Sequence, residues 1–415
     1  MDVVRESAGA GRVVLWEESA RDGAQAKTLM PADFRVALAR ETGRIFGADG
    51  PRHVVFAAGF PAVCGEEFEA VRRVAAEAEG AVSVAAVCRG ARPDLEQAVA
   101  SVRGSRHARV MVVVPASEAM AQVMVHRTAA EALGAGVELV KRARDLDDEV
   151  AVDLCFADAS RADHALMAHH AQEMTGAGAG LIVLADTVGA QLPSACREMF
   201  ARVGAAAGPE VVLASHLHND LGLGLANTLQ AAGAGVRVLS ASWLGIAERA
   251  GMVATEQLLF LLARHAGELL GADAEPWWTR PDLTRLPVIA RMVAERTGVP
   301  LSVTTPIVGT GVGSISTGTP FVHPQLFQPF DPEQTLGIAP RVVLTQLASA
   351  RVVTAVATRL GHTLDREQTR AAMDWVKRRA YRTGRAVVED AAFADYLDGL
   401  TQHTGHTDGT DGEPR

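Results

Sequence analysis

The sequence predicts a (β/α)₈ TIM barrel over residues 12–270, followed by a connector and a mainly helical C-terminal lid region. Short β-branched apolar runs alternate with longer segments of helical period, and most of the runs are nearly all apolar. Such runs are typical of parallel strands that are buried on both faces. There are eight of them. A doubly wound open sheet would show the same alternation, but the count of eight favours the closed barrel.

The predicted strands are spaced evenly enough to leave room for a helix after each one. The eight runs occupy residues 12–17, 53–58, 82–88, 108–115, 150–156, 180–185, 211–215 and 236–240. Helix-forming stretches lie between them, for example 31–42, 66–78 and 129–143. Pro31 and Asp33 indicate a helix start, because proline and an acidic residue are both common in the first turn.

The composition changes after Gly271, which predicts further domains. Residues 271–335 are expected to form a connector that contains Trp277, Trp278 and several prolines. Within it, 304–332 is rich in Gly, Ser, Thr and Pro and predicts a long ordered loop. Helical patterning then predicts a helical subdomain over 336–400. The polar, glycine-containing segment 401–415 predicts a disordered tail.

Bulk composition excludes several classes of protein. The chain has 415 residues, a net charge of −9 and 48% apolar residues. It can therefore bury a sizeable core, and it has no basic field for nucleic acid or an anionic membrane. Its four cysteines lack the spacing of a zinc ribbon, which predicts reduced thiols in a cytoplasmic protein. We expect no signal peptide and no membrane-spanning segment.

Polar residues follow the predicted strands, where barrels of this type carry their catalytic groups. His216 and His218 are two residues apart at the end of strand seven, so on an extended backbone both side chains point to the same face. Asp22, after strand one, would add a carboxylate. Two imidazoles and one oxygen leave open positions for substrate, as in a catalytic metal site. A His-x-His pair alone is common and usually binds nothing, so the prediction rests on the whole set of strand-end residues.

That set resembles the motifs of the DRE-TIM metallolyase family, which includes isopropylmalate, homocitrate, citramalate and Re-citrate synthases and hydroxymethylglutaryl-CoA lyase. The resemblance covers most of the chain, from the first predicted strand into the helical subdomain. Its segments are residues 21–25 (RDGAQ), 59–61 (GFP), 186–189 (DTVG), 216–222 (HLHNDLG) with Asn227, and 248–251 (ERAG). Residues 306–309 (PIVG) and 328–333 (QPFDPE) resemble the connector of the synthase branch, which the lyase branch lacks.

The resemblance implies an acyltransferase that condenses acetyl-CoA with a 2-oxo acid at a divalent metal, which could be Mn²⁺, Mg²⁺, Zn²⁺ or Co²⁺. Asp22, His216 and His218 would bind the metal, and Arg21 would act as a catalytic residue on the developing oxyanion. The implied substrate-binding residues are Arg21, Thr187, Arg161, Ser160 and Gln25. The residues implied to orient the metal ligands are Asn219, Asp220, Asn227 and Glu248. Alternatively, Asp220 could cap the next helix, and Glu248 and Arg249 could form an ion pair at the barrel rim.

Several positions depart from the family pattern. Ala57 and Ala157 stand where the family usually has acidic residues. Met120 stands where a histidine often follows strand four, and Met252 stands where isopropylmalate synthases have asparagine. The histidine that the family carries in its connector is also missing, and His323 is the candidate catalytic residue in its place. The alternative is that His323 is a loop histidine without a catalytic role.

The departures point toward a substrate with an additional anionic group. Losing buried carboxylates lowers the cost of binding such a group, because like charges repel strongly in a low dielectric. Backbone N–H groups and hydroxyls over residues 309–319 could hold a phosphonate or phosphinate. In these respects the sequence is similar to phosphinomethylmalate and phosphonomethylmalate synthases of natural-product biosynthesis.

Other functions remain open at the level of the sequence. Re-citrate, homocitrate or isopropylmalate synthase activity would use the same metal site. So would a retro-aldol lyase of the hydroxymethylglutaryl-CoA type, although the extension over 304–415 argues against a lyase. A third alternative is a catalytically inactive barrel kept as a binding subunit, against which the complete set of metal-binding residues argues. The resemblance also implies a homodimer.

Overall fold

The computed structural model describes residues 2–26 and 28–404, and it confirms the predicted barrel. Eight parallel strands follow one another around a closed sheet, and β8 returns to pair with β1. Glu17 of β1 lies level with Phe56 of β2 and with Ala241 of β8. The strands are β1 (Val14–Glu17), β2 (Val54–Gly59), β3 (Ser83–Arg89), β4 (Ala108–Pro115), β5 (Ala151–Ala157), β6 (Ile182–Asp186), β7 (Leu213–Leu217) and β8 (Val238–Ala241).

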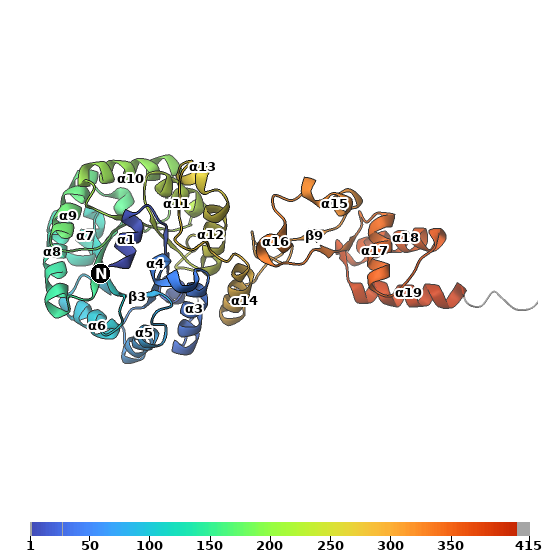
Figure 1. Cartoon of the computed structure of the whole chain (residues 1–415), viewed down its shortest axis with the longest axis horizontal. Helices are drawn as coiled ribbons and strands as arrows, with labels where there is room; N and C mark the ends of the chain where they lie inside the picture. Colours follow the sequence, from blue (N-terminus) through green and yellow to red (C-terminus); the bar gives the residue numbers. More distant parts are fainter. Residues whose placement is uncertain (1, 27, 405–415) are drawn as a thin grey trace, which may run out of the picture. The chain divides into compact units, whose positions relative to one another are not determined.

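Helices surround this sheet, as the ring in Figure 1 shows. The helices of this part of the chain are α1 (Val3–Gly9), α2 (Asp22–Ala26), α3 (Ala32–Arg44), α4 (Gly50–His53), α5 (Gly65–Glu77), α6 (Arg92–Val102), α7 (Glu118–Val125), α8 (Ala129–Leu146), α9 (His164–Gly176), α10 (Pro193–Ala207), α11 (Gly224–Gly233), α12 (Thr255–Arg264), α13 (Ala266–Leu270) and α14 (Arg285–Thr297). Three short 3₁₀ helices accompany them: η1 (Gly47–Asp49), η2 (Ala159–Arg161) and η3 (Trp243–Gly245).

The predicted strands overlap the observed ones, but all except β1 and β4 end one or two residues further toward the C-terminus than predicted. For example, the prediction ended strand six at residue 185 and strand seven at residue 215, whereas β6 ends at Asp186 and β7 at Leu217. The prediction ended each strand with its apolar run, whereas β6 continues to Asp186 and β7 includes His216. Polar residues near the ends of these two strands therefore account for their later ends.

Local sequence signals explain where several helices begin. Thr128 and Glu131 form a reciprocal capping box at the start of α8, which satisfies backbone N–H groups that have no partner inside the helix. Asp163 caps α9 through the backbone N–H of Leu166. The sequence predicted that Pro31 and Asp33 both lie in the first turn of α3. Asp33 does lie there, but Pro31 is the N-cap residue that precedes the helix.

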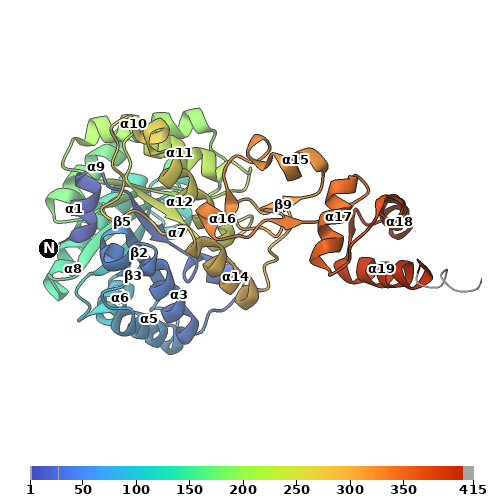
Figure 2. The same cartoon turned by 45° about the vertical axis from the view of Figure 1, so that its right-hand side comes forward.

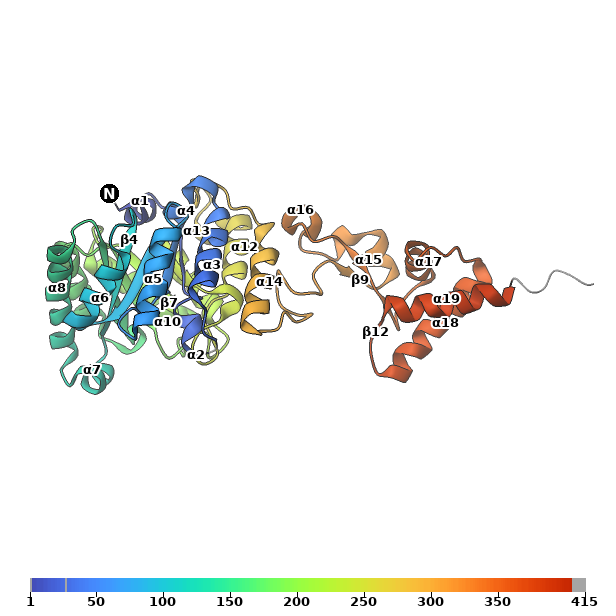
Figure 3. The same ribbon diagram turned by 90° about the horizontal axis from the view of Figure 1, so that it is seen from below.

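Helix α1 closes the amino-terminal end of the barrel, and it was not among the helices predicted from the sequence. Val4 and Ala8 belong to the same buried cluster as the residues that fill the barrel interior. Asp2 caps the helix and pairs with Arg109 of β4, which also forms a buried ion pair with Asp153. Figure 3 shows α1 and α4 at one end of the barrel and α2 and α7 at the other. The second end carries the carboxyl termini of the strands.

The part of the chain from Ser302 onward forms a second compact unit. Its core is built by α17, α18 and α19, and includes Val352, Val376 and Phe393; Figure 2 shows these helices. The elements are β9 (Ser314–Ile315), α15 (Gly318–Val322), η4 (Pro324–Leu326), α16 (Pro332–Leu336), β10 (Arg341–Val342), β11 (Leu344–Thr345), α17 (Ala350–Arg359), α18 (Arg366–Thr383), β12 (Val387–Val388) and α19 (Asp390–Thr404). β9 pairs with β10 in parallel, and β11 pairs with β12 in antiparallel orientation.

The division between the compact units falls between Leu301 and Ser302, inside the predicted connector 271–335. Short elements interrupt the predicted loop over 304–332. Of the predicted tail, residues 401–404 complete α19, and 405–415 lie outside the described residues. Three cysteines are buried and Cys64 is exposed. Among the described residues, no helix combines the length and apolarity that crossing a membrane requires.

Candidate metal centre

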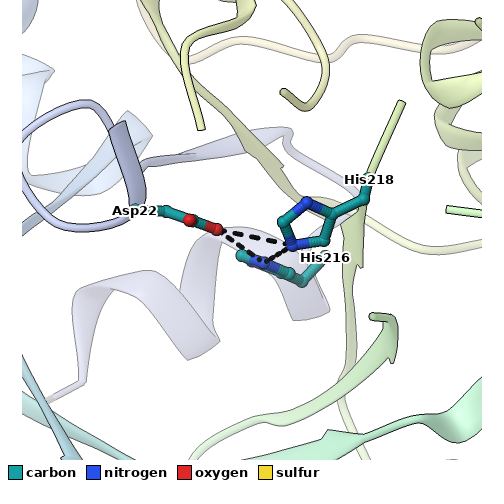
Figure 4. Close-up of side chains that lie close together, drawn as sticks. All are labelled: Asp22, His216 and His218. Atoms are coloured by element: carbon teal, nitrogen blue, oxygen red, sulfur yellow. Dashed lines mark hydrogen bonds and ion pairs between the residues drawn. The ribbon is translucent and has the colours of Figure 1, made fainter. Parts of the chain in front are cut away.

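Asp22, His216 and His218 come together at the carboxyl-terminal end of the barrel (Figure 4). Asp22 opens α2 directly after β1, and His216 and His218 lie at the end of β7. The Nε2 atoms of the two imidazoles are 3.3 Å apart, and Oδ2 of Asp22 lies 3.4 Å from one and 3.5 Å from the other. Each of the three residues is at most 5% exposed. The side chains thus form a buried triangle of possible ligand atoms.

The triangle fits a divalent cation. Three ligand atoms that each lie about 2.1 Å from an ion at tetrahedral angles would be about 3.4 Å apart, and octahedral angles would bring them to about 3.0 Å. The observed spacings are close to the first of these values. Two neutral imidazoles and one carboxylate suit Zn²⁺, Mn²⁺ or Co²⁺, and remaining positions are left for a substrate. The residues chosen from the sequence therefore have the chemistry and the spacing that a metal site needs.

The ionisable groups of the cluster shift one another's pKa values in opposite directions. Burial opposes ionisation of Asp22, but hydrogen bonding to His216 and the charge of Arg21 outweigh it and hold the pKa of Asp22 well below its usual range. Burial also opposes protonation of His216, yet Asp22 and Glu18 raise its pKa to about 9. Burial and the nearby His216 lower the pKa of His218 to about 4. The cluster thus favours a positive charge beside Asp22, a place that a bound cation would take from the proton.

Glu18 is a member of this site that the sequence analysis did not select. It is fully buried at the end of β1, and its Oε1 lies 3.4 Å from Nδ1 of His216. A carboxylate behind a ligating imidazole fixes the ring orientation and leaves Nε2 directed at the metal. The signal was present as the tandem pair Glu17-Glu18 next to Arg21-Asp22. Successive side chains of a strand point to opposite faces, so one of these two glutamates should face the inside of the barrel. The prediction did not use this alternation for the pair.

Arg21 lies beside the cluster as predicted. Its guanidinium is 3.4 Å from Oδ2 of Asp22, and its side chain is only 14% exposed. Burial would lower its pKa, but the negative charges of Glu18 and Asp22 outweigh this and raise it. Its Nε is buried and has no hydrogen-bond partner among the described residues. Arg21 therefore holds a permanent positive charge, with one donor not yet used, next to the candidate metal ligands.

Ser160, Arg161 and Thr187 lie together at the ends of β5 and β6. The Ser160 hydroxyl donates to Asp186 over 2.8 Å, and Nε of Arg161 donates to Asp158 over 2.7 Å. Thr187 Oγ1 accepts the backbone N–H of Asp158 at 2.8 Å. Because a threonine hydroxyl can accept one hydrogen bond and donate another, the Thr187 hydroxyl can still donate a hydrogen bond to a substrate oxygen.

Of the four residues expected to orient the metal ligands, Asn219, Asn227 and Asp220 form hydrogen bonds that hold loops. Oδ1 of Asn219 accepts the backbone N–H of Gly224 and so fixes the turn into α11. Asn227 donates to the backbone carbonyl of Gln191. Asp220 receives two hydrogen bonds from Arg249, and it does not cap α11. Each of these contacts holds a loop, and none of them is a direct contact with an imidazole.

Glu248 and Gln25 meet at the rim of the barrel. Gln25 donates to Oε2 of Glu248 over 3.3 Å, and that carboxylate also lies 3.7 Å from Arg249. The rim ion pair left open by the sequence is therefore present. Glu248 contacts the candidate metal ligands through its backbone, since its N–H donates to Oδ1 of Asp22 at 3.2 Å.

His323 belongs to the second compact unit and is described there by itself. It is exposed and follows α15, where its backbone N–H donates to the carbonyl of Thr319. Its proposed catalytic part remains a prediction. Met120 lies in α7 and is partly buried.

The fold and the site together define a class of protein: a (β/α)₈ barrel with a candidate divalent-metal centre at the carboxyl ends of strands one and seven. Residues 12–293 match the HMGL-like family, which is well over half of the chain. The chain therefore belongs to the HMGL-like family.

Curated relatives of the chain include several 2-isopropylmalate synthases. The 2-isopropylmalate synthase 1 of Caldanaerobacter subterraneus subsp. tengcongensis is 30% identical to this chain over 307 residues. The match covers 72% of this chain and 73% of that protein. The Caulobacter sp. (strain K31) protein is 29% identical over 300 residues, 72% of this chain and 54% of that protein. The Prochlorococcus marinus (strain MIT 9303) protein is 28% identical over 375 residues, 86% of this chain and 67% of that protein. The chain thus spans from about half to three quarters of the length of these relatives.

Solved structures show the same fold. Hydroxymethylglutaryl-CoA lyase from Pseudomonas aeruginosa superposes with a TM-score of 0.57 at 23% identity, covering 70% of this chain and 94% of that one. HMG-CoA lyase from Brucella melitensis gives a TM-score of 0.56 at 21% identity, covering 69% of this chain and 99% of that one. At these identities the similarity concerns the barrel fold alone.

Proposed function

We propose that this chain is a divalent-metal-dependent acyltransferase that condenses acetyl-CoA with a 2-oxo acid and releases CoA. The observation that carries the proposal is the buried triangle of Asp22, His216 and His218 with Arg21 at its side. The 2-isopropylmalate synthases among its relatives support the reaction class, because that product combines an acetyl unit with a 2-oxo acid.

In the proposed reaction each residue has a defined task. Asp22, His216 and His218 would hold the metal, which when bound polarises the ketone of the 2-oxo acid. Arg21 would stabilise the negative charge that develops on the ketone oxygen, since it is charged, buried and has a donor to spare. Thr187 would donate a hydrogen bond from its hydroxyl to the substrate carboxylate. Glu18 would keep the ring of His216 in place.

The bonds and protons of this reaction balance without a redox partner. A base takes a proton from the methyl group of acetyl-CoA, and the resulting carbanion forms a carbon–carbon bond to the ketone carbon. The ketone oxygen becomes an alkoxide and is protonated. Water then cleaves the thioester, giving a carboxylate and free CoA. We keep His323 as the candidate for proton transfer, and an alanine substitution there should abolish turnover without changing metal affinity.

We further propose that the 2-oxo acid carries a second anionic group, with a phosphonate or phosphinate analogue of oxaloacetate as the preferred substrate. Ala57 within β2 and Ala157 at the end of β5 supply no carboxylate, so a second anion would meet less repulsion from these two positions. Three of the backbone N–H groups over residues 309–319 do not meet the expectation from the sequence. The backbone N–H groups of Gly309, Thr310 and Gly311 donate to carbonyls of their own loop, so these groups are not available to hold an anion.

Condensation with 2-oxoisovalerate is the second candidate, because the relatives are named 2-isopropylmalate synthases. A lyase is less well supported. The Prochlorococcus match covers 86% of 415 residues, about 357, which is more than the 301 residues of the first compact unit. That similarity therefore extends into the second unit. The lyases from Pseudomonas and Brucella cover only 69–70% of the chain.

A CoA-release assay tests the proposal. The protein is loaded with Mn²⁺ and incubated with acetyl-CoA and one acid from a panel: phosphonopyruvate, phosphinopyruvate, oxaloacetate, 2-oxoglutarate, 2-oxoisovalerate or pyruvate. Free thiol is followed with a chromogenic reagent, and protein treated with EDTA and the Asp22→Asn variant serve as controls. Metal-dependent release with phosphonopyruvate or phosphinopyruvate is expected. Preference for 2-oxoisovalerate would establish the second candidate, and no release with any acid would overturn the synthase proposal.

A further inference from the structure

The loop after β8, residues 246–252, contacts the backbone or side chain of two of the three candidate metal ligands. The N–H of Glu248 donates to Oδ1 of Asp22 at 3.2 Å. Met252 forms an isolated antiparallel β-bridge with His218. The next residue, Asn219, donates its N–H to the carbonyl of Gly251 at 2.9 Å. A small displacement of this loop would therefore change the positions of two candidate ligands, Asp22 and His218, which are distant from each other in the sequence.

The contact with Asp22 also selects which oxygen faces the imidazoles. Oδ1 is occupied by the backbone N–H of Glu248, whereas Oδ2 lies 3.4 and 3.5 Å from the Nε2 atoms of His216 and His218. A carboxylate held by one oxygen has its other oxygen fixed in direction. The loop thus helps to orient the metal-facing oxygen of Asp22.

The backbone of this loop needs an external support, because it is held in an unfavourable conformation. Arg249 has φ 54°, a region that residues with side chains rarely adopt. Gly251 has φ 95°, and a Cβ there would lie 2.1 Å from the carbonyl oxygen of Gly245. A residue other than glycine stays in this left-handed conformation only where its surroundings fix it. The surroundings must therefore supply contacts that keep Arg249 in place.

The side chain of Arg249 supplies those contacts across three strand ends. Its Nε and one terminal nitrogen bind the two carboxylate oxygens of Asp220, at 3.0 and 2.9 Å. The same terminal nitrogen donates to the backbone carbonyl of Thr187 at 2.6 Å. Asp220 is two residues beyond His218, and Thr187 directly follows β6. One guanidinium therefore joins the loops that follow β6, β7 and β8.

From these contacts we infer that Arg249 is a positioning residue for the metal centre. Its planar guanidinium fixes the loop 246–252, and through that loop it sets the direction of Oδ2 of Asp22 and the backbone position of His218. The fork geometry matters in addition to the charge, because a lysine ammonium can approach one of these acceptors but cannot span the carboxylate and the carbonyl in the same way. The inference rests on the metal centre of the proposed function, but not on the identity of the 2-oxo acid.

Metal affinity tests this inference without any substrate. Mn²⁺ is titrated calorimetrically into wild-type protein and into Arg249→Met, Arg249→Lys and Asp220→Asn, each first shown to be folded by circular dichroism. We expect Arg249→Met to weaken Mn²⁺ binding about 10–100-fold, as is usual when a residue behind metal ligands is lost. Arg249→Lys and Asp220→Asn should weaken it in the same direction. The electron paramagnetic resonance spectrum of bound Mn²⁺ should broaden or shift in the variants, which a loss of stability alone would not cause.

A matched control is available on the outer surface of the barrel. Arg72 also makes two hydrogen bonds to one carboxylate, that of Glu69 on α5, at 2.7 and 2.6 Å in an exposed ion pair. Arg72→Met should leave both the Mn²⁺ affinity and the spectrum unchanged. Wild-type affinity in Arg249→Met, or an equal loss in Arg72→Met, would overturn the inference. If Arg249→Met does not fold, Asp220→Asn decides in the same way. Wild-type protein that binds Mn²⁺ but releases no CoA would count against the proposed function alone.

Discussion

The buried carboxyl group of Glu256 should make the stability of the barrel fall as the pH rises. Glu256 lies in the first turn of α12 and is fully buried. Its Oε2 accepts the backbone N–H of Leu244 at 3.0 Å, and its Oε1 has no partner among the described residues. Burial raises the pKa of Glu256 to about 7 from its ordinary value of 4.5, because few groups stabilise the charged form.

The size of the effect follows from these two pKa values. Between pH 4.5 and about 7 the folded protein keeps the proton and the unfolded chain has lost it. Stability therefore falls as the pH rises through this window and is level above it. A pKa difference of about 2.5, at about 1.4 kcal/mol for each pH unit, corresponds to about 3 kcal/mol. Glutamine keeps the shape and the acceptor for Leu244 but cannot ionise. The Glu256→Gln variant should thus be more stable than wild type by about 3 kcal/mol at pH 8.

Urea unfolding at several pH values measures this difference. The buried Trp16 and Trp243 report on the barrel through intrinsic fluorescence. The gain in stability of Glu256→Gln should be below about 1 kcal/mol at pH 5 and should grow to its full value by pH 8. Glu138→Gln, which alters an exposed pair with Lys141, should show no such growth. A difference that does not change between pH 5 and pH 8 would refute the reasoning.

Three further predictions concern the metal centre. Glu18→Gln should weaken Mn²⁺ binding about 10–100-fold by calorimetry, because the ring of His216 loses its orienting carboxylate; unchanged affinity would remove Glu18 from the site. Gly251→Ala should destabilise the protein by about 1–3 kcal/mol in urea unfolding, since a Cβ would collide with the Gly245 carbonyl; wild-type stability would mean that the loop can relax. Mn²⁺ at 100 times its dissociation constant should stabilise the fold by about 2.7 kcal/mol in the same assay, and EDTA should reverse the gain. Asp22→Asn should show no stabilisation, and a gain equal to that of wild type would place the metal elsewhere.

Much of the fold and the central ligands could be predicted because they depend on short-range patterns. A strand buried on both faces must be apolar along its length, so eight apolar runs identify eight strands. The period of two in a strand places His216 and His218 on one face, and barrel topology places Asp22 at the same end. The substrate is less well determined, because it depends on side chains from several loops and not on one pattern. The absence of acidic residues at Ala57 and Ala157 points toward a substrate with an additional anionic group, but it does not identify the 2-oxo acid.

What only the tertiary structure decided is which residues support those ligands. Asp220 and Glu248 were selected from the sequence as groups behind the imidazoles, but one holds Arg249 and the other reaches Asp22 through its backbone. Glu18, which does face His216, was overlooked. These contacts join strand ends that are distant in the sequence, and they run through a loop with left-handed residues whose direction no local periodicity predicts. The sequence by itself determined the barrel and the choice of candidate metal ligands, because apolar periodicity and strand alternation act within a few residues. The support of the ligands was decided by loop conformations that form only when the barrel closes.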